Sequence, residues 1–233
     1  MPELPDLTIY LEALERRLAG ASLVAVHLRS AFVLRSVKPP LVEAVGRRVI
    51  GLERVGKRLV IELEGELFLV VHLMIAGRLQ WKQAGASRHR GARHELARFE
   101  WSSGSLVLTE ASKKKRAWIR LVAARAAVAA LDPGGVEPLR ASDAELRATL
   151  ARENRTLKRA LTDPRLVAGI GNAYSDEILW AAAENEANYC PACQTGGRLL
   201  ADRALSRLLH GDWPKSLEEL EERKQAARGR GAR

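Results

Sequence analysis

The first residues of the chain carry its most unusual chemistry. The sequence begins Met1-Pro2-Glu3-Leu4-Pro5, and a small second residue normally allows the initiator methionine to be removed, so Pro2 is expected to present a free secondary amine. Such an amine can attack a sugar at C1′, expel the base and leave an iminium whose charge drives elimination of the flanking phosphates. The alternative is that Pro2 and Pro5 only lead into a helix, because proline is common at helix starts.

Two further residues could take part in the same chemistry. Glu3 stands next to the amine, where its carboxylate could protonate the opening sugar oxygen or relay protons; otherwise it is an exposed acid beside a helix. Lys57 lies in the basic pair of Val55-Gly56-Lys57-Arg58-Leu59, between two apparent strands. Its ammonium could meet a phosphate where the chain turns, although most lysines in turns are only solvated.

A longer string in the second half of the chain is typical of an anion site. Gly169 and Gly171 allow a close approach of the backbone, and Asn172 is expected to open a helix whose free N–H groups favour an anion. The string runs from Leu157 through Asp163-Pro164 to Leu179. A glycine-rich helix connection without a ligand is the alternative, and it accounts for a lone Gly-x-Gly better than for this whole string.

The chain contains two cysteines, Cys190 and Cys193. Their spacing suits metal or redox chemistry better than a disulfide framework. A structural zinc site needs four ligands, so this pair supplies half a site unless a distant residue such as His210 or a second chain contributes. We therefore treat Cys190 and Cys193 as a half metal site.

These residues need elements to position them, and the first half of the chain predicts a helix followed by strands. Apolar residues recur at helical spacing from Leu7 to Leu18, with Asp6 placed to cap the helix and Gly20 placed to end it. From Leu23 to about Val122, short apolar runs alternate with Gly, Pro and charged pairs, which indicates a β-sandwich or barrel. Glu64-Gly65 is a predicted hairpin turn.

The second half of the chain predicts helices. The Pro- and Gly-rich sequence from Leu131 to Leu139 marks a linker. Helical periodicity then covers Ser142 to Leu161 and Asn172 to Ala183, with turns forced at Asp163-Pro164 and at Gly169-Ile170-Gly171. The simplest interpretation is a helix, two turns and a helix.

The charge of the chain indicates the class of partner. Its 38 Lys and Arg outnumber 28 Asp and Glu, giving a net charge of +10 and a sequence pI of about 10.1. This sign favours a polyanion, although a basic surface without a specific partner has the same composition. The first segment lacks the uninterrupted apolar core of a secretory signal, and no run has the length of a membrane span. We expect a cytoplasmic protein and no membrane partner.

Taken together, the motifs resemble those of the formamidopyrimidine-DNA glycosylase and endonuclease VIII family. They occur in order over most of the chain. They are Pro2-Glu3-Leu4-Pro5, Gly56-Lys57-Arg58-Leu59, His72-Leu73 with Gly77, the stretch from Lys158 to Glu177 with its Gly-Ile-Gly-Asn-Ala-Tyr, and Tyr189-Cys-Pro-Ala-Cys-Gln194.

The resemblance implies an enzyme that removes oxidised bases from double-stranded DNA and cleaves the abasic strand by β,δ-elimination. Pro2 would be the nucleophile and Glu3 the general acid/base. Lys57, Lys158 and Asn172 would bind phosphates around a nucleotide flipped out of the duplex. A bacterial, nucleoid-associated monomer is implied, with zinc as the family's metal.

The sequence departs from the family pattern in three places. Trp180-Ala-Ala-Ala183 runs almost directly into Tyr189-Cys190, so several helices and the first cysteine pair of a zinc finger are missing, and zinc binding is doubtful. Relatives usually carry a phosphate-binding arginine shortly before the last cysteines, where this chain has Glu184-Asn-Glu-Ala-Asn188, and Asn185 is a weak substitute for it. A methionine is usual at Ile75, and an Arg-Arg-Phe loop at Lys113-Lys-Lys-Arg-Ala-Trp118. Ile75 could still act as a wedge, with charge from Lys114, Lys115 or Arg116.

We therefore predict an α+β protein. An amphipathic helix and a β-sandwich would form a catalytic domain over residues 1–124, followed by a linker at 125–140. A truncated helix-two-turn-helix domain at 141–183, a zinc-finger remnant at 184–211 and a basic tail at 212–233 complete the prediction. The alternative function is that of a DNA-binding relative without catalytic activity, and a ribosomal type of helix-two-turn-helix module is a third possibility. His72 and Trp118 are expected to be structural, since such residues beside strands are usually packed.

Overall fold

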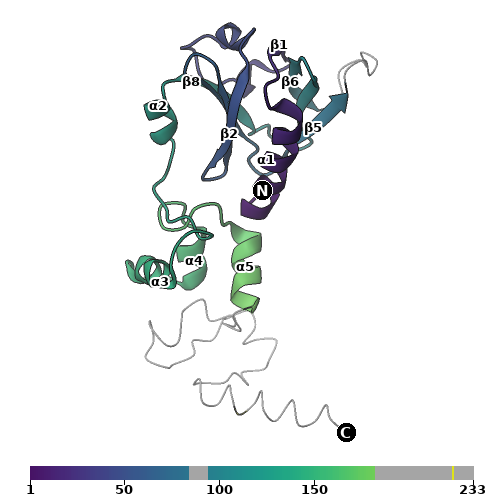
Figure 1. Cartoon of the computed structure of the whole chain (residues 1–233). Helices are drawn as coiled ribbons and strands as arrows, with labels where there is room; N and C mark the ends of the chain where they lie inside the picture. Colours follow the sequence, from purple (N-terminus) through teal and green to yellow (C-terminus); the bar gives the residue numbers. More distant parts are fainter. Residues whose placement is uncertain (84–93, 182–221, 223–233) are drawn as a thin grey trace. The chain divides into compact units, whose positions relative to one another are not determined.

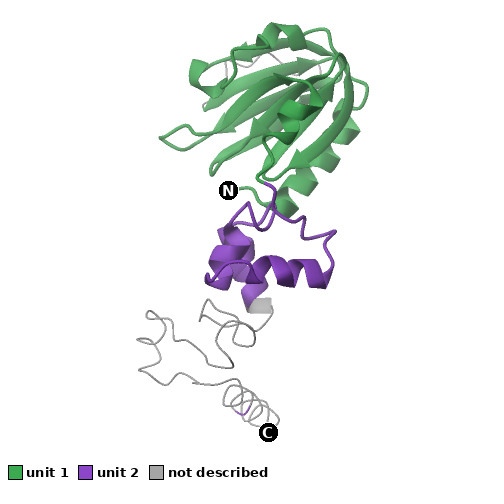
Figure 2. Cartoon of the chain, turned by 90° about the vertical axis from the view of Figure 1, so that its left-hand side faces the viewer, with its two compact units in different colours: residues 1–133 green, residues 134–233 purple. Residues whose placement is uncertain are grey.

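The computed structural model describes residues 1–83, 94–181 and 222. The chain forms two compact units, Met1–Pro133 and Gly134–Arg233 (Figures 1 and 2). Within the described residues, no helix combines the length and apolar character needed to cross a bilayer.

The first unit begins with helix α1 (Leu4–Leu18), whose N-cap is Glu3. Asp6 lies at the third helical position, and its Oδ2 accepts a hydrogen bond from the Glu3 backbone N–H at 2.9 Å, so the two residues form a capping box. The expectation that Asp6 caps the helix after Pro5 was therefore wrong. The helix begins earlier because proline is tolerated in a first turn, where the N–H it lacks would have no partner within the helix.

Among the described residues, eight strands follow α1 and form two antiparallel four-stranded sheets, with orders β1-β6-β7-β5 and β2-β3-β4-β8. Two short 3-10 helices, η1 (Ala31–Val33) and η2 (Leu41–Ala44), lie between the first two strands. This arrangement confirms the predicted β-sandwich, and Figure 2 shows it in green. The strands are β1 (Leu23–Leu28), β2 (Val49–Val55), β3 (Arg58–Leu63), β4 (Leu67–His72), β5 (Gly77–Gln83), β6 (Glu95–Trp101), β7 (Gly104–Glu110) and β8 (Trp118–Ala123).

The main core lies between the two sheets. Alternation along a strand sends neighbouring side chains to opposite faces. In β3, Leu59 and Ile61 join the main core with residues of the other sheet, whereas Val60 belongs to a second cluster with Phe68, Val70, Trp118 and Val128. The predicted Glu64-Gly65 turn joins β3 to β4, with Gly65 at φ 81°.

A short helix, α2 (Arg125–Ala129), occupies part of the segment expected to be a linker at 125–140. Its Val128 is 2% exposed and packs in the second cluster, together with Leu131. Arg125 forms ion pairs with Glu53 and Glu62 of the neighbouring strands. Residues 125–131 are therefore part of the first unit's packing.

The described part of the second unit contains α3 (Asp143–Ala151), α4 (Leu157–Thr162) and α5 (Asn172–Ala181). The continuous helix expected from Ser142 to Leu161 is interrupted between α3 and α4, so that expectation was wrong. Each helix has its own N-cap: Ser142 Oγ accepts from Glu145 N–H, and Thr156 Oγ1 accepts from Arg159 N–H. A threonine that caps a new helix cannot also continue the preceding one.

Candidate active site and nucleic-acid interface

Pro2 and Glu3 lie at the start of α1, and both are buried. A pocket of about 110 Å³ opens beside them and is lined by Met1, Pro2, Asp6, Tyr10 and Arg78. Arg78 is held toward the pocket by a hydrogen bond from its Nη1 to the Gly77 carbonyl at 2.7 Å. The nucleophile predicted from the sequence therefore borders a small polar pocket that can accept part of a ligand.

Glu3 directly follows Pro2 as the N-cap of α1, whereas the acidic residue that lines the pocket itself is Asp6. The Glu3 side chain is nearly inaccessible, with the residue 3% exposed. The capping box with Asp6 fixes its backbone, because both ends of the reciprocal hydrogen-bond pair belong to the first turn of α1. A buried carboxylate fixed one residue from Pro2 is suited to proton transfer there.

Lys57 lies in the turn between β2 and β3, where Gly56 has φ 57°. Burial lowers the pKa of Lys57, and the charge of Glu3 partly opposes this by raising it. The two residues therefore interact electrostatically, although they are far apart in sequence. The structure brings Lys57 to the same end of the first unit as Pro2 and Glu3.

His72, which the sequence predicts to be structural, is the last residue of β4. Its Nδ1 accepts a hydrogen bond from the Met74 backbone N–H at 2.9 Å, so the neutral imidazole carries its proton on Nε2. Burial lowers the pKa of His72 to about 4, helped by the positive charges of Arg58, Lys57 and Arg35. A neutral histidine with an oriented Nε2–H among cations is a suitable donor to a phosphate. The signal in the sequence was its position at the end of a strand, directly before a turn.

The state of His72 leads to a pH prediction. In the free protein we expect the C2–H resonance of His72 to titrate near pH 4, because cations and burial disfavour the imidazolium. The unfolded chain binds this proton more tightly, so stability falls as the pH drops from 6.5 toward 4. Unfolding midpoints of wild type and His72→Gln should therefore diverge over this range, with the wild type losing more. A midpoint at pH 6 or above would contradict this electrostatic description.

The loop between β7 and β8 is built around Glu110, which is 1% exposed. Its Oε2 accepts hydrogen bonds from the backbone N–H groups of Arg116, at 2.7 Å, and Ala117, at 3.0 Å. The Lys115 ammonium donates a hydrogen bond to the Glu110 carbonyl. The backbone of this basic loop is therefore fixed, Lys115 bends back onto it, and the Arg116 side chain is exposed.

Ile75 lies in the tight turn between β4 and β5 and is 56% exposed. The turn is closed by a hydrogen bond from Gly77 N–H to the Leu73 carbonyl at 2.9 Å. A Cβ at Gly77 would lie 2.3 Å from that carbonyl oxygen, so only glycine fits this close approach. The turn thus presents an apolar side chain to solvent, as a wedge residue requires.

In the second unit, the candidates Lys158 and Asn172 belong to adjacent helices. Lys158 of α4 forms an ion pair with Asp176 of α5, and Asn172 is the exposed first residue of α5. The helix therefore begins where the sequence predicted. The Ser175 hydroxyl, which is fully buried, donates to the Asn172 carbonyl at 2.9 Å and stabilises this first turn.

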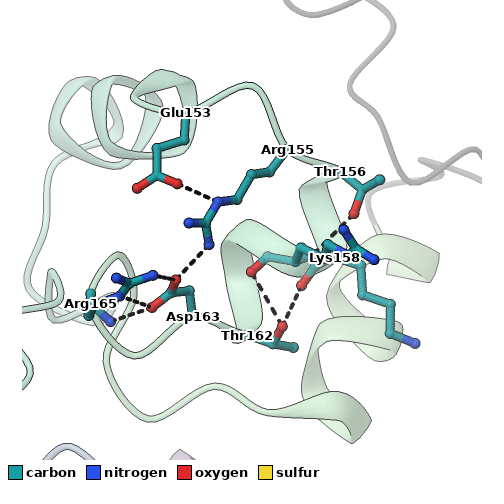
Figure 3. A network of polar contacts seen from close by, with 8 residues as sticks. Glu153, Arg155, Thr156, Lys158, Thr162, Asp163 and Arg165 are labelled. Carbon is teal, nitrogen blue, oxygen red and sulfur yellow. Dashed lines mark hydrogen bonds and ion pairs between the residues drawn. The ribbon is translucent and has the colours of Figure 1, made fainter.

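A polar network supports the turn that follows α4 (Figure 3). Asp163 accepts hydrogen bonds from Arg165 Nη2 and from Arg155 Nη1, both at 2.7 Å. The Arg165 side chain is the main reason why the pKa of Asp163 lies well below its usual range. Figure 3 shows Arg155 between Glu153 and Asp163, with the Lys158 ammonium directed away from this network. The carboxylate thus organises the connection between α4 and the glycine turn.

The predicted metal ligands Cys190 and Cys193 lie outside the described residues, as do the zinc-finger remnant at 184–211, Asn185, His210 and the basic tail. Within the described residues, no group of three or more His, Cys, Asp or Glu side chains could hold a metal ion. The whole sequence contains two cysteines, which is half of a tetrahedral structural zinc site. This donor set does not fit the family's zinc site.

Comparison with known protein families gives two matches. A family model described as the formamidopyrimidine-DNA glycosylase N-terminal domain matches residues 1–118. A second, described as the formamidopyrimidine-DNA glycosylase H2TH domain, matches residues 135–190. Together, the two matched ranges contain the described candidate residues of both units.

Individual relatives agree. A formamidopyrimidine-DNA glycosylase of Moorella thermoacetica is 38% identical over 191 residues, covering 78% of this chain and 67% of the relative. One of Heliobacterium modesticaldum is 34% identical over 185 residues, covering 77% of this chain and 66% of the relative. The chain thus spans about two thirds of the length of these relatives.

Solved structures show the same similarity. A complex of Lactococcus lactis Fpg with DNA containing an abasic site aligns with a TM-score of 0.68 and 25% identity, covering 77% of this chain and 66% of that one. A complex of the inhibited Lactococcus lactis enzyme with DNA containing N7-benzyl-Fapy-dG aligns with a TM-score of 0.69 and 26% identity, covering 80% of this chain and 71% of that one.

Proposed function

The chain belongs to the formamidopyrimidine-DNA glycosylase family, and on this premise we propose that it is a base-excision DNA glycosylase with abasic-site lyase activity. Its substrate would be double-stranded DNA containing an oxidised base. The observation that carries the proposal is the position of Pro2, which borders a polar pocket beside the buried carboxylate of Glu3. Further support comes from the similar Lactococcus lactis protein, which was crystallised with abasic-site DNA.

The proposed reaction begins at the nitrogen of Pro2, once Met1 has been removed. The nitrogen lone pair attacks C1′ of the damaged nucleotide, and the bond from C1′ to the base breaks. The base leaves with the bonding electron pair and takes up the proton that the amine nitrogen loses. Glu3 supplies the proton that the opening sugar oxygen needs. The product is an iminium between Pro2 and the sugar, with the base released.

Strand cleavage follows from the same iminium. Its positive charge acidifies the C2′ hydrogen, and loss of that proton expels the 3′ phosphate, which is the β-elimination. A second elimination expels the 5′ phosphate, and hydrolysis of the remaining imine frees Pro2. A secondary amine is suited to these steps because its iminium has no N–H proton to lose and remains cationic.

The other candidates would hold the DNA. We propose that Lys57 and His72 bind backbone phosphates at the first unit, and that Lys158 and the N-terminus of α5 at Asn172 do so at the second. Because Lys158 pairs with Asp176 in the free protein, a phosphate would replace that carboxylate. Ile75, Lys115 and Arg116 would occupy the space left by the flipped nucleotide, and one copy of the chain would suffice.

Borohydride trapping tests this proposal. Incubating the protein with borohydride and a duplex containing an abasic site or an oxidised purine should give a stable covalent adduct, because reduction converts the iminium into an amine. The same duplex without the lesion is the control and should give none. DNA binding without an adduct, while a full-length relative is trapped in parallel, would favour a DNA-binding protein without catalysis.

A further inference from the structure

Three arginines surround one tryptophan on the outer face of the β2-β3-β4-β8 sheet. Trp118 of β8 pairs with His72 of β4, and the β3–β4 register places Arg58 beside His72 in the same row. Arg120 lies two residues after Trp118 and therefore shares its face. Arg35 reaches the row from another segment, since its backbone N–H donates to the Ile119 carbonyl at 2.9 Å.

The guanidinium groups lie close to the indole ring. The distances from the guanidinium carbon to the Trp118 ring centroid are 5.7 Å for Arg35, 5.9 Å for Arg58 and 5.2 Å for Arg120. Each distance is within the range of a cation–π contact. Trp118 itself is 6% exposed, so the three cations converge on a largely buried aromatic platform.

The positive charge of this cluster is poorly compensated. Arg58 Nε and Arg120 Nε are buried and have no hydrogen-bond partner within the part of the chain that the structure describes. Burial and the nearby charge of Arg120 lower the pKa of Arg58, while Asp132 raises it. Like charges gathered at a half-buried position oppose folding unless an anion balances them.

We propose that Arg35, Arg58 and Arg120 around Trp118 form an anion site that binds a phosphate group. Guanidinium groups present forked N–H donors that match phosphate oxygens, and the two buried Nε–H groups are donors in need of an acceptor. The phosphate could belong to a nucleic-acid backbone or be free in solution. The backbone is favoured by continuity with His72 in the same row, and in that form the inference rests on the proposed function.

The structure also provides a matched control. Arg17 of α1 lies over Trp81 of β5 at 5.9 Å, so it makes the same kind of contact. In the described contacts a single arginine lies over Trp81, whereas three lie over Trp118. Arg17 therefore represents an arginine that covers a tryptophan without a cluster of like charges. Arg120→Gln and Arg17→Gln remove the same group from the two settings.

The first experiment uses inorganic phosphate and thermal unfolding. Phosphate should raise the unfolding midpoint of wild type above that in potassium chloride of equal ionic strength, because a ligand that binds the folded state stabilises it. Arg120→Gln should lose this increase and unfold at a higher temperature than wild type without phosphate. Arg17→Gln should keep the increase. Equal phosphate responses in the wild type and both variants would overturn the site.

The second experiment separates the two sources of phosphate by measuring binding to an undamaged duplex as a function of salt. Each lost backbone contact lowers the slope of log K against log[salt] by about 0.9. We expect this reduction and roughly tenfold weaker binding at low salt for Arg120→Gln, and the same direction for the exposed Arg35→Gln, which tests the site without disturbing the core.

The outcomes are distinct. An unchanged slope with a phosphate-dependent midpoint would assign the site to free phosphate, whereas a reduced slope assigns it to the backbone. Unchanged values in both experiments would refute the proposal. Because the duplex carries no lesion, a result here does not depend on base excision, and failure of borohydride trapping would reject the enzymatic function while leaving this site intact.

Discussion

Pro2→Gly is expected to reduce the yield of borohydride-trapped adduct on abasic-site DNA by about 100-fold or more. The substitution removes the pyrrolidine nitrogen, whose iminium cannot lose an N–H proton, and replaces it with a primary amine on a less constrained residue. Pro2 is buried beside a small polar pocket, so the reacting atom is held by its surroundings, and a freely rotating glycine amine would lose that orientation. Trapping is measured on denaturing gels against time.

Pro5→Gly is the matched control for this prediction. Pro5 belongs to the first turn of the same helix, but its nitrogen is an amide and cannot attack a sugar. The control should be trapped at close to the wild-type rate, after both variants are shown to fold by their unfolding midpoints. Equal loss in both variants would mean that the prolines act only by starting the helix, which is the alternative considered from the sequence.

Glu3→Gln is expected to slow release of an oxidised base by roughly 10²- to 10⁴-fold, the range of general acid–base catalysis. The amide keeps the size of the side chain and leaves the Glu3 backbone N–H free to donate to Asp6. It cannot deliver a proton. Trapping on a preformed abasic site should be far less affected, because the base has already left and the abasic sugar opens to its aldehyde in solution without a proton from Glu3.

Comparing DNA that contains an oxidised base with DNA that contains an abasic site distinguishes a catalytic role of Glu3 from a structural one. Glu12→Gln, an exposed acid on the same helix, should behave as wild type on both. If Glu3→Gln loses both activities to the same extent, Glu3 serves to hold the helix start. If it loses neither, Glu3 has no part in proton transfer.

Much of the architecture could be predicted from the sequence, because it depends on local patterns. The short apolar runs from Leu23 to about Val122, separated by Gly, Pro and charged pairs, predict a β-sandwich or barrel, and Glu64-Gly65 predicts a hairpin turn that the structure contains. Helix boundaries were less predictable. The break between α3 and α4 depends on Thr156, which caps a new helix. This break could not be predicted, because the residues on both sides of Thr156 are good helix formers.

The candidate site could be predicted only in part. Pro2, Glu3 and Lys57 were recognisable from motifs, since their residue types are unusual at those positions. The proposed phosphate-binding role of His72 could not be predicted from spacing, because it depends on Met74, which sets the tautomer, and on cations from distant segments, which lower the pKa of His72. The cluster of arginines around Trp118 could not be predicted either, because the register of three strands, and not spacing along the chain, brings them together.

Mass spectrometry of the reduced adduct tests the central claim most directly. After borohydride reduction and tryptic digestion, the modified peptide should be Pro2–Arg16, with Met1 absent and the sugar attached to the Pro2 nitrogen. Attachment to a lysine such as Lys57, or a trapped peptide that still begins with Met1, would contradict the proposal that Pro2 is the nucleophile.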